Sequence, residues 1–464
     1  MPGQLLSPPD DVATGDRTEV KYRRYHPTGS CSYVNQSQAF RLSGRDFQRQ
    51  YFHIYSHRLQ AMRARLERQL AQSHPQARVI SLSELSGHKQ QEVTLIGTLY
   101  KHQELKPNIL QDLSEDNGLL PPPVHTKYIS PEDDLILEDN LQRIRLRGSH
   151  INVARLVTGV VCAVWGTEKE SGKLEVNDIV FPSGVAAVPR PIPEHTSYVV
   201  FVSGLELADP QGASLSAFQL AVDWIIGEAG EMDEQKDNAQ IQRVIIAGNS
   251  LDESTKDRAE MAKAKYLTKD VAASSIDAIK QLDDFLVQLA GSVDVDIMPG
   301  AFDPANQTLP QQPLHKCLFP ATNVYSTLHC VTNPYQFELE GTECLGLSGQ
   351  ITDDIIRNSE LDSPLDVMES LLRWSHLAPT SPDTLGCFPY AKNDPFILEK
   401  SPHVMFSGNQ NLFESRVVDV NGSPVHLLSI PRFKTSHSVV AMNLKSLTFE
   451  EIHFDASLTC PWLK

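Results

Sequence analysis

The chain has 464 residues, of which 41% are hydrophobic and 21% charged, close to an average globular protein. This composition excludes wholesale disorder, a collagen-like chain and a coiled coil, and the length indicates two or three domains. The formal net charge is −17, which excludes a surface that binds nucleic acid over its whole extent, because phosphate binding needs clustered cations. We also expect no membrane span and no secretory signal, since the longest apolar run covers only residues 156–165.

The charge is unevenly distributed along the chain. Residues 1–100 contain 13 Lys and Arg against 8 Asp and Glu, whereas residues 201–300 contain 8 against 18. Any DNA contact is therefore expected to be weak, or to come from the N-terminal part or a partner. The acidic stretch suits a basic partner surface. The seven cysteines are scattered without a C-x-x-C pair, which is unsuited to zinc and typical of a reducing compartment.

The N-terminal part begins without a regular pattern. Residues 1–40 are rich in Pro, Ser, Asp and Thr, and we expect a flexible arm. Apolar residues at three- to five-residue steps then predict a helix over residues 47–70, with a capping-box-like start at Ser43 and Asp46. Its arginines are expected to form a solvated outer face: Arg45, Arg49, Arg58, Arg63, Arg65 and Arg68.

From residue 92 the pattern changes to strands. Runs rich in β-branched residues, bounded by Gly, Asn and Pro, cover residues 92–101, 135–148, 156–168 and 173–182. Several short strands with turn signals indicate a small OB-type β-barrel, so we expect residues 41–185 to form a helix-plus-barrel domain. Residues 102–134 interrupt the strands as a long loop whose order the sequence leaves open. Tyr100, Trp165 and Phe181 could stack bases or pack in the core, and the core is favoured.

A second domain is expected after a Pro-rich connector over residues 186–196. Within residues 197–464, apolar strands alternate with amphipathic helices, which indicates an α/β layered domain with any site at the strand ends. The strands cover residues 198–207, 243–252 and 293–304, and the helices residues 214–230, 274–292 and 363–374. No Walker loop and no G-x-S-x-G elbow is present, so nucleotide hydrolysis and serine nucleophile chemistry lack their motifs.

The three strand ends read SGLEL (203–207), AGNSLD (247–252) and PGAFDP (299–304), and their order resembles the calcineurin-like metallophosphoesterases. Those enzymes hold two divalent metals with carboxylate, imidazole and amide ligands, and the metals activate a water. Asp252 and Asp303 match that pattern. The remaining ligand positions are occupied here by Gly204, Glu206, Asn249, Ala301, Phe302, Ser348, Asn409 and Asn411. The resemblance therefore implies an α/β sandwich that has lost its metal ligands, with no catalytic residue, metal or cofactor.

Further motifs point to a family that joins an OB barrel to such an inactivated domain. The segment SHLAPTSPDTLGCFPY (375–390), with TNPYQFELEG (332–341) and SGQITDDI (348–355), resembles the B-subunits of replicative DNA polymerases, the delta type in particular, over residues 45–450. The resemblance implies a nuclear protein that binds the C-terminal cysteine-rich domain of the catalytic subunit. It also implies contacts with a clamp-binding accessory subunit and a smallest subunit, and shared use by the translesion polymerase zeta.

The leading interpretation is a non-catalytic scaffold for DNA replication and repair. One alternative is a metal-dependent phosphodiesterase or nuclease built on Glu206, Asp252 and Asp303. The other is a single-stranded DNA-binding protein that uses the barrel and the arginine face of residues 45–68. The sequence does not say which surface residues contact which partner.

Overall fold

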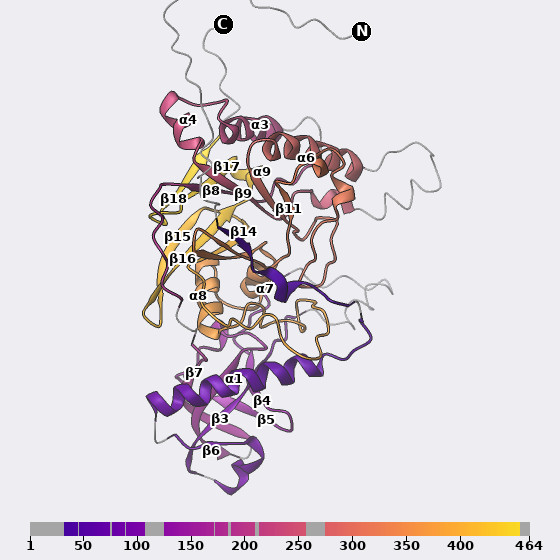
Figure 1. The fold of residues 1–464 in the computed structure, drawn as a ribbon. Coiled ribbons are helices and arrows are strands. Elements are labelled where there is room, and N and C mark those ends of the chain that lie inside the picture. Colours follow the sequence, from indigo (N-terminus) through magenta and orange to yellow (C-terminus); the bar gives the residue numbers. More distant parts are fainter. Residues whose placement is uncertain are drawn as a thin grey trace, which may run out of the picture.

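The computed structural model describes residues 32–44, 46–74, 77–88, 90–106, 125–170, 172–183, 187–208, 213–256 and 274–454. These residues form a β-barrel with an N-terminal helix lying across it, and a larger α/β sandwich stacked on the barrel (Figure 1). The predicted fold class, an OB-type barrel followed by an α/β sandwich, is confirmed. Within the described ranges, no helix has both the length and the apolar character needed to cross a bilayer.

The barrel closes because β3 pairs on both of its edges, with β4 and with β6. Its strands are β2 (Val79–Ile80), β3 (Glu92–His102), β4 (Asp134–Glu138), β5 (Arg143–Arg147), β6 (Val161–Glu170) and β7 (Lys173–Val180). The stretch predicted as strand over residues 135–148 is a hairpin. Its turn forms because the Asp139 carboxylate accepts hydrogen bonds from the backbone N–H groups of Leu141 and Gln142, both at 2.8 Å.

Helix α1 (Phe52–Ser73) lies across the barrel (Figure 1). Its apolar stripe packs against β3 and β6 in one cluster of buried residues: Leu59, Met62, Leu66, Leu70, Ile96, Val161 and Ala163. The predicted start of this helix is wrong. Asp46 instead accepts a hydrogen bond from the Gln48 backbone N–H and pairs with Arg49, which holds an exposed, non-helical segment before the helix.

Within the predicted N-terminal arm, the described residues 32–40 contain regular structure that packs on the sandwich. Strand β1 (Tyr33–Asn35) pairs antiparallel with β12 (Tyr335–Leu339) at the edge of a sandwich sheet. The Tyr33 ring lies 3.7 Å from the Arg243 guanidinium, and its hydroxyl is 2.8 Å from that of Tyr335. These tertiary contacts order a segment whose composition alone indicates an irregular chain. Residues 1–31 lie outside the described residues.

The sandwich consists of two six-stranded sheets. One has the order β11 (Leu328–Cys330), β10 (Asp294–Met298), β9 (Ile241–Ala247), β8 (Tyr198–Val202), β17 (Ser438–Asn443) and β18 (Phe449–His453). The other has the order β1, β12, β13 (Thr342–Leu347), β14 (Val404–Gln410), β16 (Ser423–Pro431) and β15 (Glu414–Val420). Strands β8 to β11 are parallel, so their carboxyl ends meet at one edge of their sheet.

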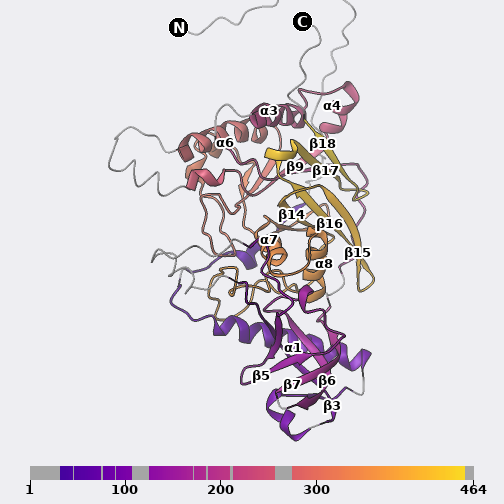
Figure 2. The same ribbon diagram turned by 180° about the vertical axis from the view of Figure 1, so that it is seen from behind.

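Helices cover the outer face of each sheet. Helices α3 (Ala213–Ile226) and α6 (Ser274–Ala290) lie on the first sheet, and α7 (Gln350–Asn358) and α8 (Pro364–Trp374) lie between the second sheet and the barrel (Figures 1 and 2). The helix predicted over residues 214–230 stops at Ile226, because Gly227 and Gly230 have positive φ angles, and a separate short helix α4 (Met232–Asn238) follows. The predicted start of α8 is confirmed, since the Ser363 hydroxyl caps it.

One buried cluster runs from the barrel into the sandwich. It contains Leu95 and Leu137 of the barrel together with Leu371 of α8. The connector is also fixed to the sandwich, because the Arg190 guanidinium donates hydrogen bonds to the carbonyl oxygens of Leu444 (2.5 Å) and Lys445 (2.9 Å). Barrel and sandwich therefore share a continuous core in the described residues.

Candidate functional site

The predicted site residues lie where the parallel strands end. The loops after β8 and β9 run side by side, with Gly204 N–H donating to the Gly248 carbonyl and Glu206 N–H donating to the Asn249 carbonyl, both at 3.0 Å. Gly204, Glu206, Asn249 and Asn409 all have positive φ angles. Such backbone conformations persist where surrounding structure imposes them, and they cluster at functional sites. The structure therefore brings together the strand ends that the sequence singled out.

The amide side chains at these positions link one loop to another. Asn249 accepts a hydrogen bond from the Phe302 backbone N–H at 3.2 Å. Asn409 donates to the carbonyl oxygens of Ala247 (3.2 Å) and Ser348 (2.7 Å). The Ser348 hydroxyl in turn donates to the Gln350 side chain at 2.6 Å. The amides thus hold the loops together by hydrogen bonds to protein groups.

Asp303, one of the two matching carboxylates, also binds protein groups. It is 2% exposed, and its oxygens accept hydrogen bonds from the backbone N–H groups of Leu251 (3.0 Å) and Gly300 (2.7 Å). A carboxylate with such partners organises the loops around it and has fewer lone pairs left for a metal. Asn411 lies on the wall of a hollow of about 550 Å³ next to these contacts, which Asn409, Asp353 and Arg432 also line.

Lysine 434 supplies a cation at the two remaining carboxylates. Its ammonium group pairs with Asp252 and lies 3.3 Å from Glu206. Burial by itself would raise the pKa of Asp252, but the hydrogen bonds from Lys434 and from the Ser254 backbone lower it below its ordinary value. Glu206 and Asp252 therefore share one ammonium group of the protein itself, which compensates one of their two negative charges.

The residues present do not fit a two-metal centre. Among the described residues, no group of three or more His, Cys, Asp or Glu side chains is placed to hold a metal ion. The loops also approach one another closely, because a Cβ atom at Gly300 would lie 2.1 Å from the Asn249 backbone nitrogen. Two divalent metals need several hard anionic ligands and open positions for water and substrate. The alternative site built on Glu206, Asp252 and Asp303 has no support in this geometry.

The segment that carries the family signature has a structural role. Arg58 of α1 is fully buried, and its guanidinium pairs with Asp394 at 2.8 Å and donates to the carbonyl oxygens of Pro379 (2.9 Å) and Ser381 (3.0 Å). His376 lies 2.8 Å from the same Asp394 oxygen. This Arg58–Asp394–His376 cluster fixes the barrel helix to the signature segment of the sandwich.

The electrostatics of the cluster follow from its burial. Burial and, after it, the nearby positive charge of Arg58 lower the pKa of His376 to about 4, against the attraction of Asp394. Burial opposes ionisation of Asp394, but Arg58 and His376 hold the pKa of Asp394 well below its usual range. The cluster therefore contains one arginine cation, one carboxylate anion and a neutral imidazole.

The expected basic outer face of α1 is wrong for three of its arginines. Arg58 is buried, Arg63 donates to the Ile96 carbonyl of the barrel, and Arg65 donates to the Leu398 carbonyl of the sandwich. These side chains join protein to protein. The described part of the helix therefore does not present the continuous cationic face that the DNA-binding alternative requires.

The sequence interpretation missed Arg58 and Lys434. Arg58 could have been found, because it stands four residues after Ile54 and four before Met62, and so belongs to the apolar stripe itself. Lys434 could not. It follows β16 by three residues, and only the tertiary fold brings it to the ends of β8 and β9.

Residues 199–415 match the family model of the DNA polymerase alpha/epsilon B-subunit, and residues 50–179 match the one described as DNA polymerase delta subunit OB-fold domain. A solved structure described as a novel archaeal phosphodiesterase covers 55% of this chain at 9% identity, with a TM-score of 0.25, and a similarity that low carries no argument.

Curated relatives match over nearly their full length. The Drosophila melanogaster protein "DNA polymerase delta subunit 2" is 40% identical, with 91% of this chain and 97% of the relative covered. The Arabidopsis thaliana "DNA polymerase delta small subunit" is 38% identical, covering 95% and 99%. The Saccharomyces cerevisiae protein of the same description is 30% identical, covering 91% and 93%. The chain belongs to the family of DNA polymerase delta small subunits.

Proposed function

We propose that this chain is a non-catalytic scaffold that holds the polymerase delta catalytic subunit together with the other accessory subunits in DNA replication and repair. Its binding partners in this proposal are the C-terminal cysteine-rich domain of the catalytic subunit, the clamp-binding accessory subunit and the smallest subunit. The proposal extends to shared use by polymerase zeta in translesion synthesis, to a nuclear location and to DNA contact that is weak or indirect.

The observation that carries the proposal is the filling of the strand ends by the protein's own groups. One ammonium group pairs with both Glu206 and Asp252, Asp303 binds backbone N–H groups, and Asn409 bridges two loops. A phosphoesterase instead keeps hard ligands and open coordination positions at this edge of the sheet. Each of these contacts stabilises the fold, which supports a domain selected for its surface rather than for chemistry.

A second observation supports a scaffold with a fixed shape. The buried Arg58–Asp394 pair and the continuous core hold barrel and sandwich together. Rigid partners lose little conformational entropy on association, so a surface composed of both domains is well suited to binding.

The proposal is tested by co-expressing the full chain with the cysteine-rich C-terminal domain of the catalytic subunit, followed by size-exclusion chromatography with light scattering. We expect a single species with 1:1 stoichiometry. Separate elution of a folded, monodisperse chain would contradict the proposal. The same purified chain should contain less than about one tenth of an equivalent of manganese or zinc by elemental analysis, and stoichiometric metal would support the phosphodiesterase alternative.

A further inference from the structure

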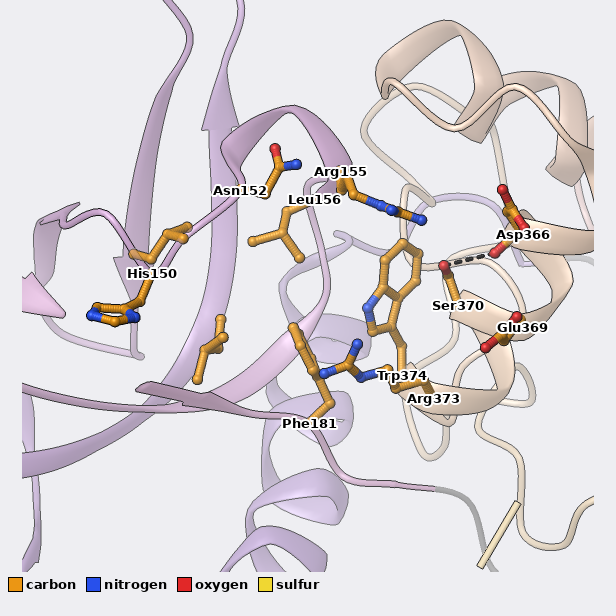
Figure 3. A pocket seen from close by; sticks show the side chains of 12 residues that line it. His150, Asn152, Arg155, Leu156, Phe181, Asp366, Glu369, Ser370, Arg373 and Trp374 are labelled. Carbon is orange, nitrogen blue, oxygen red and sulfur yellow. Dashed lines mark hydrogen bonds between the residues drawn. The ribbon is translucent and has the colours of Figure 1, made fainter. Parts of the chain in front are cut away.

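A pocket lies between the barrel and helix α8, away from the strand ends (Figure 3). It has a volume of about 350 Å³, at the lower end of the range for ligand pockets. The barrel contributes Arg155, Leu156 and Phe181 to its wall, and α8 contributes Arg373 and Trp374. A pocket of this size accepts one or two side chains of another molecule rather than a folded domain.

Two guanidinium groups reach this pocket without an ion pair. Arg155 extends from the barrel toward Trp374, and Arg373 lies over the Phe181 ring with its guanidinium carbon 4.9 Å from the ring centroid (Figure 3). In the part of the chain that the structure describes, neither guanidinium has a carboxylate within 4 Å. Their five N–H donors each remain available to an anion that enters the pocket.

The Trp374 indole adds a donor from a side chain that is itself buried. Trp374 is only 3% exposed, yet its side chain forms part of the pocket wall, and the indole nitrogen faces the barrel side of the pocket (Figure 3). Its N–H has no hydrogen-bond acceptor among the described residues. The indole nitrogen is not among the fully buried unpaired atoms, so its N–H is accessible from the pocket and can donate to an acceptor that enters it.

The acidic side chains of α8 do not pair with the two pocket arginines. Asp366 and Glu369 line the same pocket, but both pair with Arg416 of β15, at 2.7 Å and 3.3 Å. They leave Arg155 and Arg373 uncompensated, and they also place negative charge at the rim. The wall thus carries two arginine cations beside two carboxylates that share Arg416, a charge balance that favours a single carboxylate over a polyanion such as a nucleic-acid backbone.

We propose that this pocket anchors an aspartate or glutamate side chain on a segment of a partner protein, with Arg155 and Arg373 as its ion-pair donors and the Trp374 indole N–H as a third donor. Guanidinium groups match the planar carboxylate and bind it through charge-assisted hydrogen bonds. This inference rests on the proposed scaffold function, and it locates one contact of the partner at the junction of barrel and sandwich.

The first test uses the assembled complex and the variant Arg155→Lys, which keeps the charge and introduces a primary amine. Zero-length carbodiimide coupling followed by mass spectrometry should link position 155 to an aspartate or glutamate of a partner protein. The control Arg143→Lys changes an exposed arginine of β5 outside the pocket, and it should give no link to a partner. Links from position 155 to this chain alone, or no link at all, would overturn the proposal.

The second test measures affinity. The double variant Arg155→Glu/Arg373→Glu should weaken the binding of one partner at least about tenfold, because the partner's carboxylate would then face two like charges in place of two opposite ones. Arg143→Glu should change this affinity by less than about twofold, because Arg143 lies outside the pocket. Unchanged affinity for every partner would overturn the pocket proposal while leaving the scaffold intact. Failure of the unaltered chain to assemble would overturn the scaffold itself.

One outcome identifies a different ligand. If a phosphate backbone rather than a carboxylate occupies the pocket, the unaltered chain will bind a single-stranded oligonucleotide with a steep salt dependence, and the double glutamate variant will abolish that binding. That result would also overturn the proposal.

Discussion

Removing the Arg58 guanidinium should destabilise the whole protein. In the variant Arg58→Met the volume is largely kept, but Asp394 loses the cation that pairs with it at 2.8 Å, and the carbonyl oxygens of Pro379 and Ser381 lose their donors. The Asp394 side chain is 0% exposed, so water cannot replace the arginine. Breaking a buried pair by removing one partner costs about 3–5 kcal/mol of unfolding free energy.

The charge origin of this loss can be separated from the loss of packing. In the double variant Arg58→Met/Asp394→Asn no uncompensated charge is buried, so part of the loss should be recovered, about 1–3 kcal/mol. Arg68→Met on the same helix is the matched control, because Arg68 is exposed, and it should change stability by less than about 0.5 kcal/mol.

The assay is urea unfolding of the purified full chain, followed by circular dichroism and by intrinsic fluorescence, with refolding checked for reversibility. The reasoning is refuted if Arg58→Met loses less than about 1 kcal/mol. It is also refuted if the double variant is less stable than the single one, because the buried carboxylate would then not be the source of the cost.

Three further outcomes follow from the structure. Burial lowers the pKa of His376 from an ordinary 6.5 to about 4 in the folded protein. As the pH falls, this histidine is therefore protonated in the unfolded chain before it is protonated in the folded one. The free energy of unfolding should fall by about 3 kcal/mol between pH 6.5 and pH 4. His426 contributes in the same direction, and His376→Gln should flatten the slope measured by urea titration at each pH. Lys434→Met should lower the free energy of unfolding by only about 1 kcal/mol, because the lysine side chain is 42% exposed. Calorimetry of this variant with Mn²⁺ should show no binding, since Glu206 and Asp252 alone are too few ligands to hold the metal. Gly300→Ala should lower the melting temperature by several degrees, because the added Cβ would lie 2.1 Å from a backbone nitrogen. Gly386→Ala is the control and should leave the melting temperature unchanged, because the atom nearest to its added Cβ would be 3.7 Å away.

The fold could be predicted from the sequence wherever an apolar periodicity, a helix cap or a β-branched run determines the local structure. Helix α8 has Ser363 as its cap, Pro364 at its first position and an apolar stripe, and it forms where these signals place it. The strands of the barrel follow their β-branched runs. Strand β1 was missed because its order comes from Tyr33 stacking on Arg243, a contact that no local pattern announces.

The candidate site was predictable in position and only partly in its contacts. Parallel strands present their carboxyl ends at one edge of a sheet. The sequence alone therefore predicts that Gly204, Asn249 and Asp303 lie close together. The cation at Glu206 was not predictable, because Lys434 is more than two hundred residues distant in the chain. A long-range pair of this kind depends on the tertiary fold alone.

The central claim is that the contacts at the strand ends stabilise the fold and carry no chemistry. The most direct test is a reconstituted polymerase complex in which this chain carries Glu206→Gln and Asp252→Asn, the two carboxylates that pair with Lys434. We predict that subunit stoichiometry and primer extension stay within about twofold of the unaltered complex, because a contact that stabilises only the fold leaves transition-state binding unchanged. A complex that assembles fully but loses primer extension or phosphodiester hydrolysis by more than about tenfold would contradict the account.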